Sequence, residues 1–228
     1  MACNETTPMD QEIQFIADNL RTQFSKGELC ESTRRFGFLR VAGCIALSVL
    51  CDVSSAADHY RVDPDHTFAH FAVVHTGVSS VRGRVGVTKG SATLDAAQQS
   101  AEVDVEIDPR SLDTGVKKLD ALLSGEMFFD VGKFKTARFA GRAVRFADGV
   151  PVEFEGQLTI KGVTRPIRLN AERFVCQEVT ILVIKRFVCG GDLSASLKRS
   201  DFGLTKYLSM VSDDVRITIS VEAIREGQ

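Results

Sequence analysis

Apolar and polar residues alternate through most of the chain from His59 onward. The clearest segments are FAVVH at 71–75, AEVDVEID at 101–108, PVEFEGQLTI at 151–160, PIRLN at 166–170, GDLSASLK at 191–198 and VRITISVEAI at 215–224. Since successive side chains of a strand point to opposite faces, each segment can bury one face and leave the other in water. This pattern is typical of antiparallel sheets.

Turn signals separate these segments, and one segment departs from the alternation. The turn signals are Thr76-Gly77, Lys89-Gly90, Ala147-Asp148-Gly149 and Lys161-Gly162. Residues 113–130 place Val116, Leu119, Leu122 and Leu123 at helical spacing, and Gly125 stops that pattern. A further short helical turn is expected at 204–211. We therefore predict an all-β fold, a single antiparallel barrel of about eight strands with one inserted helix, with a sandwich as the alternative.

The N-terminal quarter of the chain has the features of an export signal. Residues 34–57 read RRFGFLRVAGCIALSVLCDVSSAA: a basic start, an uncharged apolar run, then small side chains. The run from Val41 to Cys51 has 11 residues, which cover about half of a bilayer core, so no stable membrane span is expected. A buried helix or membrane anchor is the alternative. Residues 1–33 are then a polar extension or a misassigned start, and residues 58–228 form the mature domain.

The six cysteines divide between these regions. Cys3, Cys30, Cys44 and Cys51 precede the predicted cleavage point, which leaves Cys176 and Cys189. Two cysteines in an oxidising compartment predict one disulfide. A structural zinc site would need four nitrogen or sulfur ligands, and no CxxC motif supplies them. A reactive thiol remains the alternative.

Charge and motifs give no positive sign of catalysis. The formal net charge of −2 gives no reason to expect nucleic acid as a partner. No GxSxG, HExxH, P-loop or dinucleotide fingerprint occurs, so we expect no catalytic residue and no cofactor. His66, His70 and His75 could form a metal-dependent site only across a sharp bend. On one strand His66 and His70 would be about 13 Å apart, and His70 and His75 would point to opposite faces.

Several motifs together resemble the YceI family. The stretch from Tyr60 to Asp95 contains DPDHT, FAVVH and VRGRV, and later motifs are FFDVGKF at 128–134, GQLTIKGVTRP at 156–166 and RSDFG at 199–203. The resemblance covers about residues 59–224. It implies an exported, lipocalin-like barrel protein that binds polyisoprenoid lipids or isoprenoid quinones. The apolar VTILVI between the two cysteines is a departure from the family pattern.

The resemblance implies a periplasmic carrier that holds an isoprenoid-type lipid without catalysis, and such a ligand needs an apolar cavity. The candidate lining residues are Phe71, Val73, Val105, Leu122, Phe128, Phe129, Phe134, Phe139, Phe154, Leu158, Leu193 and Phe202. The candidate polar residues at the mouth are His66, His75, Asp120, Arg199 and Asp201. The alternatives are a structural or stress-related envelope protein with a filled core, or a metal-dependent enzyme. The sequence leaves a homodimer open.

Overall fold

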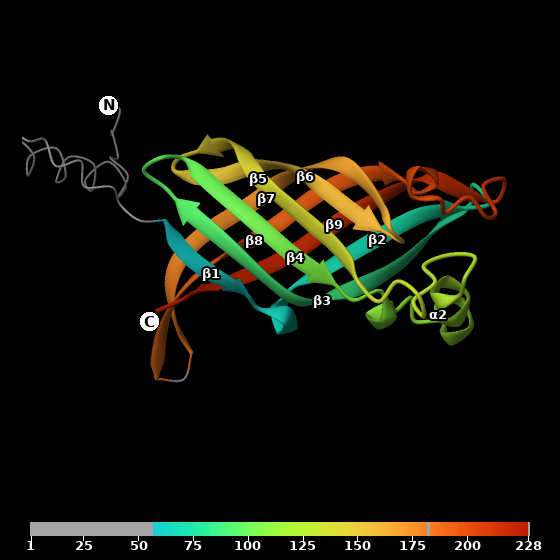
Figure 1. Ribbon diagram of the computed structural model, residues 1–228, viewed down its shortest axis with the longest axis horizontal. Coiled ribbons are helices and arrows are strands. Elements are labelled where there is room, and N and C mark those ends of the chain that lie inside the picture. Colours follow the sequence, from blue (N-terminus) through green and yellow to red (C-terminus); the bar gives the residue numbers. More distant parts are fainter. Residues whose placement is uncertain (1–56, 182, 228) are drawn as a thin grey trace, which may run out of the picture. The chain divides into compact units, whose positions relative to one another are not determined.

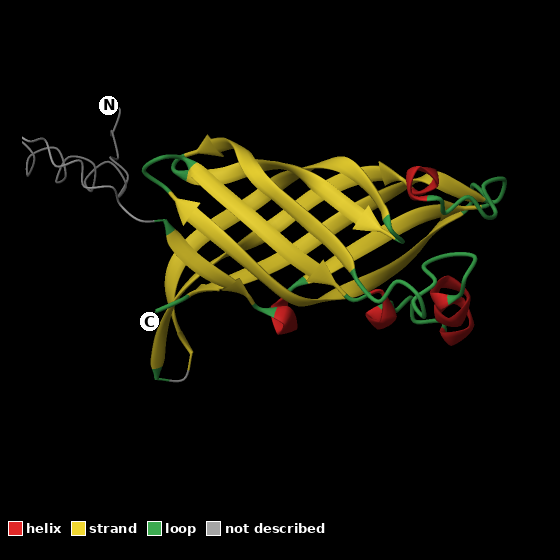
Figure 2. Ribbon diagram, in the orientation of Figure 1, coloured by secondary structure: helices red, strands yellow, loops and turns green. Residues whose placement is uncertain are grey.

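The computed structural model describes residues 57–181 and 183–227. The predicted polar extension and all but the last residue of the predicted export signal lie outside the described residues, so both remain predictions. Within the described residues, nine strands form one sheet and one α-helix lies at its margin (Figures 1 and 2).

The strands account for most of the domain. They are β1 (Asp58–Val62), β2 (Phe68–His75), β3 (Ser79–Asp95), β4 (Ser100–Ile107), β5 (Ala137–Ala147), β6 (Val150–Ile160), β7 (Val163–Ile181), β8 (Ile184–Lys198) and β9 (Val211–Arg225). The short 3₁₀ turns are η1 (Pro64–His66), η2 (Pro109–Ser111) and η3 (Arg199–Phe202), and the helix is α2 (Lys117–Ser124).

The sheet closes on itself as an antiparallel barrel with eight strand positions. The order is β1-β3-β2-β9-β8-β7-β6-β5-β4, and further pairings join β3 to β4 and β1 to β9. β1 and β2 both lie between β3 and β9, and they share one position: β2 pairs with Val211–Ser220 of β9, and β1 pairs with Ala223–Arg225. The turn η1 fills the break between them. The predicted all-β barrel of about eight strands is confirmed.

Three of the four predicted turns occur where the sequence placed them. Thr76-Gly77, Asp148-Gly149 and Lys161-Gly162 all have positive φ at both residues, the conformation that two-residue hairpin turns require. The fourth prediction is wrong, because Lys89-Gly90 lies inside β3, beside a register shift between Val87 and Lys89.

The inserted helix is shorter than the sequence pattern suggested. α2 covers Lys117–Ser124 and is capped by Gly125, whose N–H donates to the carbonyl of Leu122. The expected helical turn near 204–211 takes another form: η3 comes earlier, and hydrogen-bonded turns around Tyr207 lead into β9. Among the residues that the structure describes, no helix is long and apolar enough to cross a membrane.

The β7–β8 hairpin carries the disulfide and extends beyond the barrel wall at the end opposite α2 (Figure 1). Cys176 and Cys189 are directly paired across the two strands and are joined by an S–S bond of 2.04 Å. The predicted disulfide is therefore confirmed. Beyond it the hairpin continues to Ile184, and the side chain of Val183 is 91% exposed.

Candidate functional site

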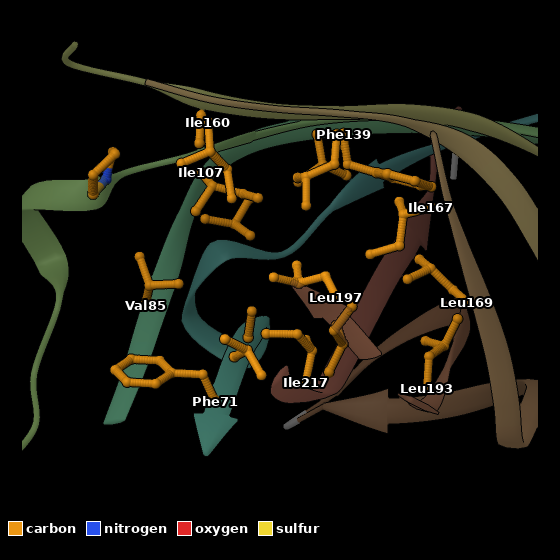
Figure 3. Close-up of a pocket in the computed structure, with 18 of the residues that line it drawn as sticks. Phe71, Val85, Ile107, Phe139, Ile160, Ile167, Leu169, Leu193, Leu197 and Ile217 are labelled. Atoms are coloured by element: carbon orange, nitrogen blue, oxygen red, sulfur yellow. The ribbon is translucent and has the colours of Figure 1, made fainter. Parts of the chain in front are cut away.

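A cavity of about 700 Å³ runs inside the barrel. Figure 3 shows side chains from several strands converging on it, including Phe71, Phe139, Leu193 and Ile217. The walls are almost wholly aliphatic and aromatic. An interior of this kind lies within the size range of small-molecule sites, and it offers hydrocarbon contact with few hydrogen-bonding groups.

The strand alternation explains which side chains reach this interior. Along β2, the side chains of Ala69, Phe71, Val73 and His75 line the cavity, and the residues between them face outward. Eleven of the twelve residues predicted to line a cavity do so: Phe71, Val73, Val105, Leu122, Phe128, Phe129, Phe139, Phe154, Leu158, Leu193 and Phe202. Whether they contact a ligand remains a prediction.

Phe134 is the exception, and its placement corrects the prediction. It is not among the cavity-lining residues that the structure describes. Its ring lies against the β6–β7 turn, where a Cβ added to Gly162 would come within 3.0 Å of Phe134 Cε1. The ammonium group of Lys133 lies 5.3 Å from the centre of the same ring. Phe134 follows the last turn after α2 and not a strand, so alternation does not decide its direction.

A pair of glycines makes room for the ring of Phe139. Gly141 of β5 and Gly156 of β6 are cross-strand partners. A Cβ on Gly141 would lie 2.8 Å from Phe139 Cζ, and a Cβ on Gly156 would lie 2.7 Å from Phe139 Cε2. The ring therefore covers the space that two missing side chains leave. This arrangement keeps a large aromatic residue close to the wall of the cavity.

The cavity reaches solvent at the end of the barrel that carries α2. Five lining residues are exposed: Glu102, Leu122, Lys206, Tyr207 and Met210. Four of them belong to α2 and to the segment between η3 and β9, which lie at the same end of the barrel (Figure 1). The side chains of Tyr207 and Met210 are about half exposed, at 49% and 50%. We call α2 together with residues 204–210 the mouth of the cavity.

Arg199 lines the cavity near this mouth, but four of the five N–H groups of its guanidinium donate to the backbone. The group donates to the carbonyls of Leu204, Lys206, Val211 and Ser212 at 2.6–2.9 Å. The side chain is buried, and this desolvation lowers its pKa, while the charge of Asp213 acts in the opposite direction. Arg199 therefore holds residues 204–212 in place.

The other residues predicted for the polar mouth separate into two groups. His75 lines the cavity at the end of β2. Asp120 does not: its carboxylate accepts hydrogen bonds from the N–H and hydroxyl of Thr114 and so fixes the loop before α2. Asp201 is exposed in η3 and also lies outside the lining. Asp120 was predicted to lie at the polar mouth, but its carboxylate is occupied by local hydrogen bonds to Thr114.

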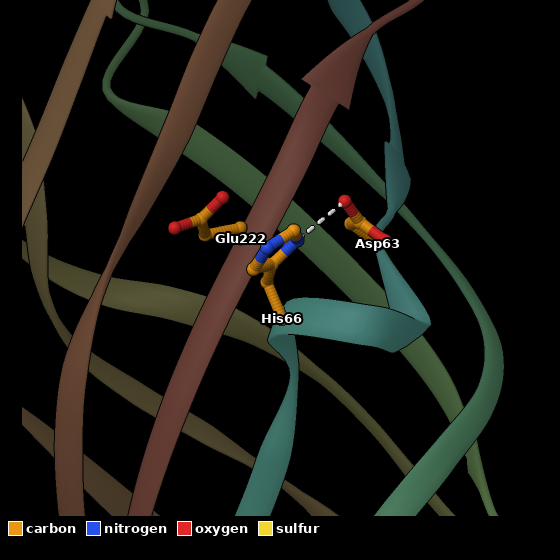
Figure 4. A group of neighbouring side chains, drawn as sticks. All are labelled: Asp63, His66 and Glu222. Atoms are coloured by element: carbon orange, nitrogen blue, oxygen red, sulfur yellow. Dashed lines mark hydrogen bonds and ion pairs between the residues drawn. The ribbon is translucent and has the colours of Figure 1, made fainter.

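His66 was predicted to lie at the polar mouth, but the structure places it on the outer surface, in η1. Its Nδ1 is 2.9 Å from Oδ2 of Asp63, and its side chain is 63% exposed. The hydrogen bond to Asp63 and the negative charges of Asp63 and Glu222 raise the pKa of His66, and the same hydrogen bond lowers the pKa of Asp63. Figure 4 shows Glu222, from β9, on the other side of the imidazole.

The structure does not bring together the three histidines considered as a metal site. His70 is exposed on the outer face of β2, His75 lines the cavity, and His66 lies in η1. Glu222 was missed as a partner of His66 because it is far away in sequence and becomes a neighbour only through the β1–β9 pairing. Lys206, Tyr207 and Met210 were also missed, because they lie in a loop without a periodic pattern.

Comparison with known proteins agrees with this architecture. A family model described as the YceI-like domain matches residues 60–223. A UPF0312 protein of Enterobacter sp. (strain 638) is 34% identical over 191 residues, which cover 82% of this chain and 97% of that protein.

Two solved structures share the fold. BcnA of Burkholderia cenocepacia has 23% identity and a TM-score of 0.54, with 71% of this chain and 98% of that chain covered. A polyisoprenoid binding domain from Saccharophagus degradans has 16% identity and a TM-score of 0.50, with 75% and 99% covered. With the family model matching nearly all of the described barrel, the chain belongs to the YceI-like family.

Proposed function

We propose that this protein is a non-catalytic carrier that holds one isoprenoid-type lipid, a polyprenyl chain or a quinone, inside the barrel. The observation that carries the proposal is the cavity of about 700 Å³ with nearly continuous apolar walls. A polyprenyl chain can pack against such walls because it has no polar atoms that would need hydrogen-bond partners. The same cavity argues against the alternative of an envelope protein with a filled core.

The polar residues at the open end suit a lipid headgroup. His75 and Lys206 line the cavity there and can offer hydrogen-bond donors, while Arg199 is committed to the backbone. The hydrocarbon tail would then lie deeper, among residues such as Phe154 and Leu193. A polyisoprenoid binding domain with the same fold in Saccharophagus degradans supports this class of ligand.

The site of action that we propose is the periplasm. Residues 34–57 have the order of a cleaved export signal, and a periplasmic carrier could move a hydrophobic lipid through water. The disulfide between Cys176 and Cys189 is consistent with an oxidising compartment.

Native mass spectrometry of the exported protein tests the proposal. We expect a chain that begins near Asp58, weighs two hydrogens less than the reduced form, and carries one lipid of several hundred daltons that denaturing extraction releases. A protein that arrives empty and takes up no added polyprenol or quinone would overturn the carrier function.

A pair of variants on one strand separates loss of the cavity from loss of the fold. Phe71→Arg places a charge in the cavity, whereas Val74→Arg places the same charge on the outer face of β2, where Val74 is already 46% exposed. We expect Phe71→Arg to lose most of its lipid, and Val74→Arg to keep it. Equal occupancy in both variants would show that the ligand does not lie beside Phe71.

A further inference from the structure

One histidine and two acidic residues form a cluster on the outer surface of the barrel, away from the cavity. One ligand atom each from Asp63, His66 and Glu222 lies within 4.8 Å of the others (Figure 4). Asp63 precedes η1 and His66 is its last residue. Glu222 is in β9 between two residues that line the cavity, Val221 and Ala223. Glu222 therefore points away from the interior, and the cluster is independent of the lipid site.

We propose that Asp63, His66 and Glu222 bind one divalent transition-metal ion of the Zn²⁺ class. The set offers one imidazole nitrogen and two carboxylates, which are the nitrogen and oxygen ligands that such ions accept, and water can complete the coordination.

The spacing of the ligand atoms suits a single ion after small side-chain rotations. Ligands about 2.0–2.1 Å from a tetrahedral zinc lie roughly 3.4 Å from one another. His66 Nδ1 and Asp63 Oδ2 are 2.9 Å apart, and a hydrogen bond between them uses the Nδ1 proton. An ion would take the place of this proton, so the two groups need to separate only slightly. The carboxylate of Glu222 is exposed and free to rotate toward them.

Hydrogen bonds hold the carboxylate of Asp63 and the main chain of Glu222 in position. Asp63 Oδ1 accepts a hydrogen bond from the N–H of Asp65, which leaves Oδ2 directed at His66. The N–H of Asp63 donates to the carbonyl of Glu222 at 2.8 Å. The hydroxyl of Thr67, which is only 2% exposed, accepts from the N–H of Glu222 at 3.2 Å and faces its carbonyl at 3.4 Å. The hydrogen bond to Asp63 Oδ1 is of the kind that orients a ligating carboxylate in metal sites.

The charges near His66 favour a cation. Asp63, Glu222 and Asp65 all act on His66 with negative charge, whereas Arg61 lies near Asp63 and opposes them. A bound ion would also join η1 to β9 at the break where β1 gives way to β2. We therefore expect the ion to stabilise the closure of the barrel at its one interrupted strand position.

Calorimetric titration with Zn²⁺ tests the proposal, with the full chain and with its free thiols alkylated. Alkylation is needed because four cysteines outside the Cys176–Cys189 disulfide would compete for zinc. We expect one equivalent to bind, and the affinity to fall at least tenfold in His66→Ala and in Glu222→Gln. His70→Ala is the matched control, because it removes another exposed histidine of the same region and should bind like the wild type.

Cobalt-induced broadening of the histidine ring signals in NMR gives a second readout that does not depend on a variant. One equivalent of Co²⁺ should broaden the signals of His66 before those of His70. The proposal is overturned if His66→Ala keeps wild-type affinity, if His70→Ala weakens binding as much, or if Co²⁺ broadens both rings equally.

Discussion

The ring of Phe71 covers Gly83, its cross-strand partner on β3. A Cβ built on Gly83 would lie 2.4 Å from Cζ and 2.7 Å from Cε1 of that ring. Real Cβ atoms do not come so close, so the absence of a side chain at Gly83 allows Phe71 to stay against the wall. Any side chain at this position must move the ring, and the space next to it is the cavity.

Gly83→Ala is therefore expected to displace Phe71 and to reduce lipid occupancy. Forcing a methyl group into a packed wall costs about 1–3 kcal/mol of unfolding free energy. Gly86→Ala on the same strand is the control, because its added Cβ would meet no atom closer than 3.5 Å. Occupancy measured by native mass spectrometry should fall in the first variant only. An unchanged lipid occupancy in Gly83→Ala would show that the ring of Phe71 can move without displacing the lipid.

The disulfide is expected to stabilise the β7–β8 hairpin and the part of the core beneath it. Cys189 is buried with Tyr60, Val62 and Ala223. The loop that the bond closes has a sequence separation of 13, for which the chain-entropy model gives about 3 kcal/mol. Replacing both cysteines with alanine should lower the free energy of unfolding in urea by roughly 2–4 kcal/mol. A double variant as stable as the wild type would contradict this prediction.

Arg199 is expected to control the mouth through the backbone and not through contact with a headgroup. Arg199→Met keeps a long apolar side chain but leaves four carbonyl groups without their donor. Each buried carbonyl left unsatisfied costs about 1–3 kcal/mol unless water reaches it. Hydrogen exchange of the amides at 204–212 should accelerate, and bound lipid should leave faster. The same exchange rates in the variant and the wild type would refute the role.

The strand alternation predicted the cavity wall well because it needs no knowledge of distant contacts. Once a segment is a strand, period two decides which side chains face inward, as in Phe71 and Val73 of β2. The false turn at Lys89-Gly90 shows the limit of this reasoning. Gly90 lets the side chains of Val62 and Val105 pack close to the backbone of β3, because a Cβ there would lie 2.9 Å from Val62 and 3.0 Å from Val105. The sequence does not show those neighbours.

Polar residues were harder to place, because local hydrogen bonds and distant pairings decide their role. Asp120 and Arg199 are polar residues near the mouth, yet both are used to hold loops. His66 was expected beside the lipid, and the structure places it outside, next to Glu222. That neighbour follows from the shared position of β1 and β2, which no local pattern of the sequence indicates.

The pair formed by His66 and Asp63 predicts a dependence of stability on pH in the metal-free protein. The hydrogen bond with Asp63 raises the pKa of His66 in the folded state. The pair therefore stabilises the fold fully below the ordinary histidine pKa of about 6.5, and the contribution is lost as the pH rises through the folded-state pKa. The effect should be small, because the imidazole is 63% exposed and solvent screens the interaction.

Titration of the His66 ring by NMR, with a chelator present, measures this coupling. Asp63→Asn removes the negative charge, so the pH midpoint of the His66 titration should fall. The variant keeps a side-chain oxygen that can accept from the N–H of Asp65. Asp65→Asn is the control: Asp65 acts on His66 only through its charge and more weakly than Asp63, so the midpoint should fall less. If the midpoint in Asp63→Asn equals that of the wild type, the hydrogen bond between Asp63 and His66 does not set the protonation of the imidazole.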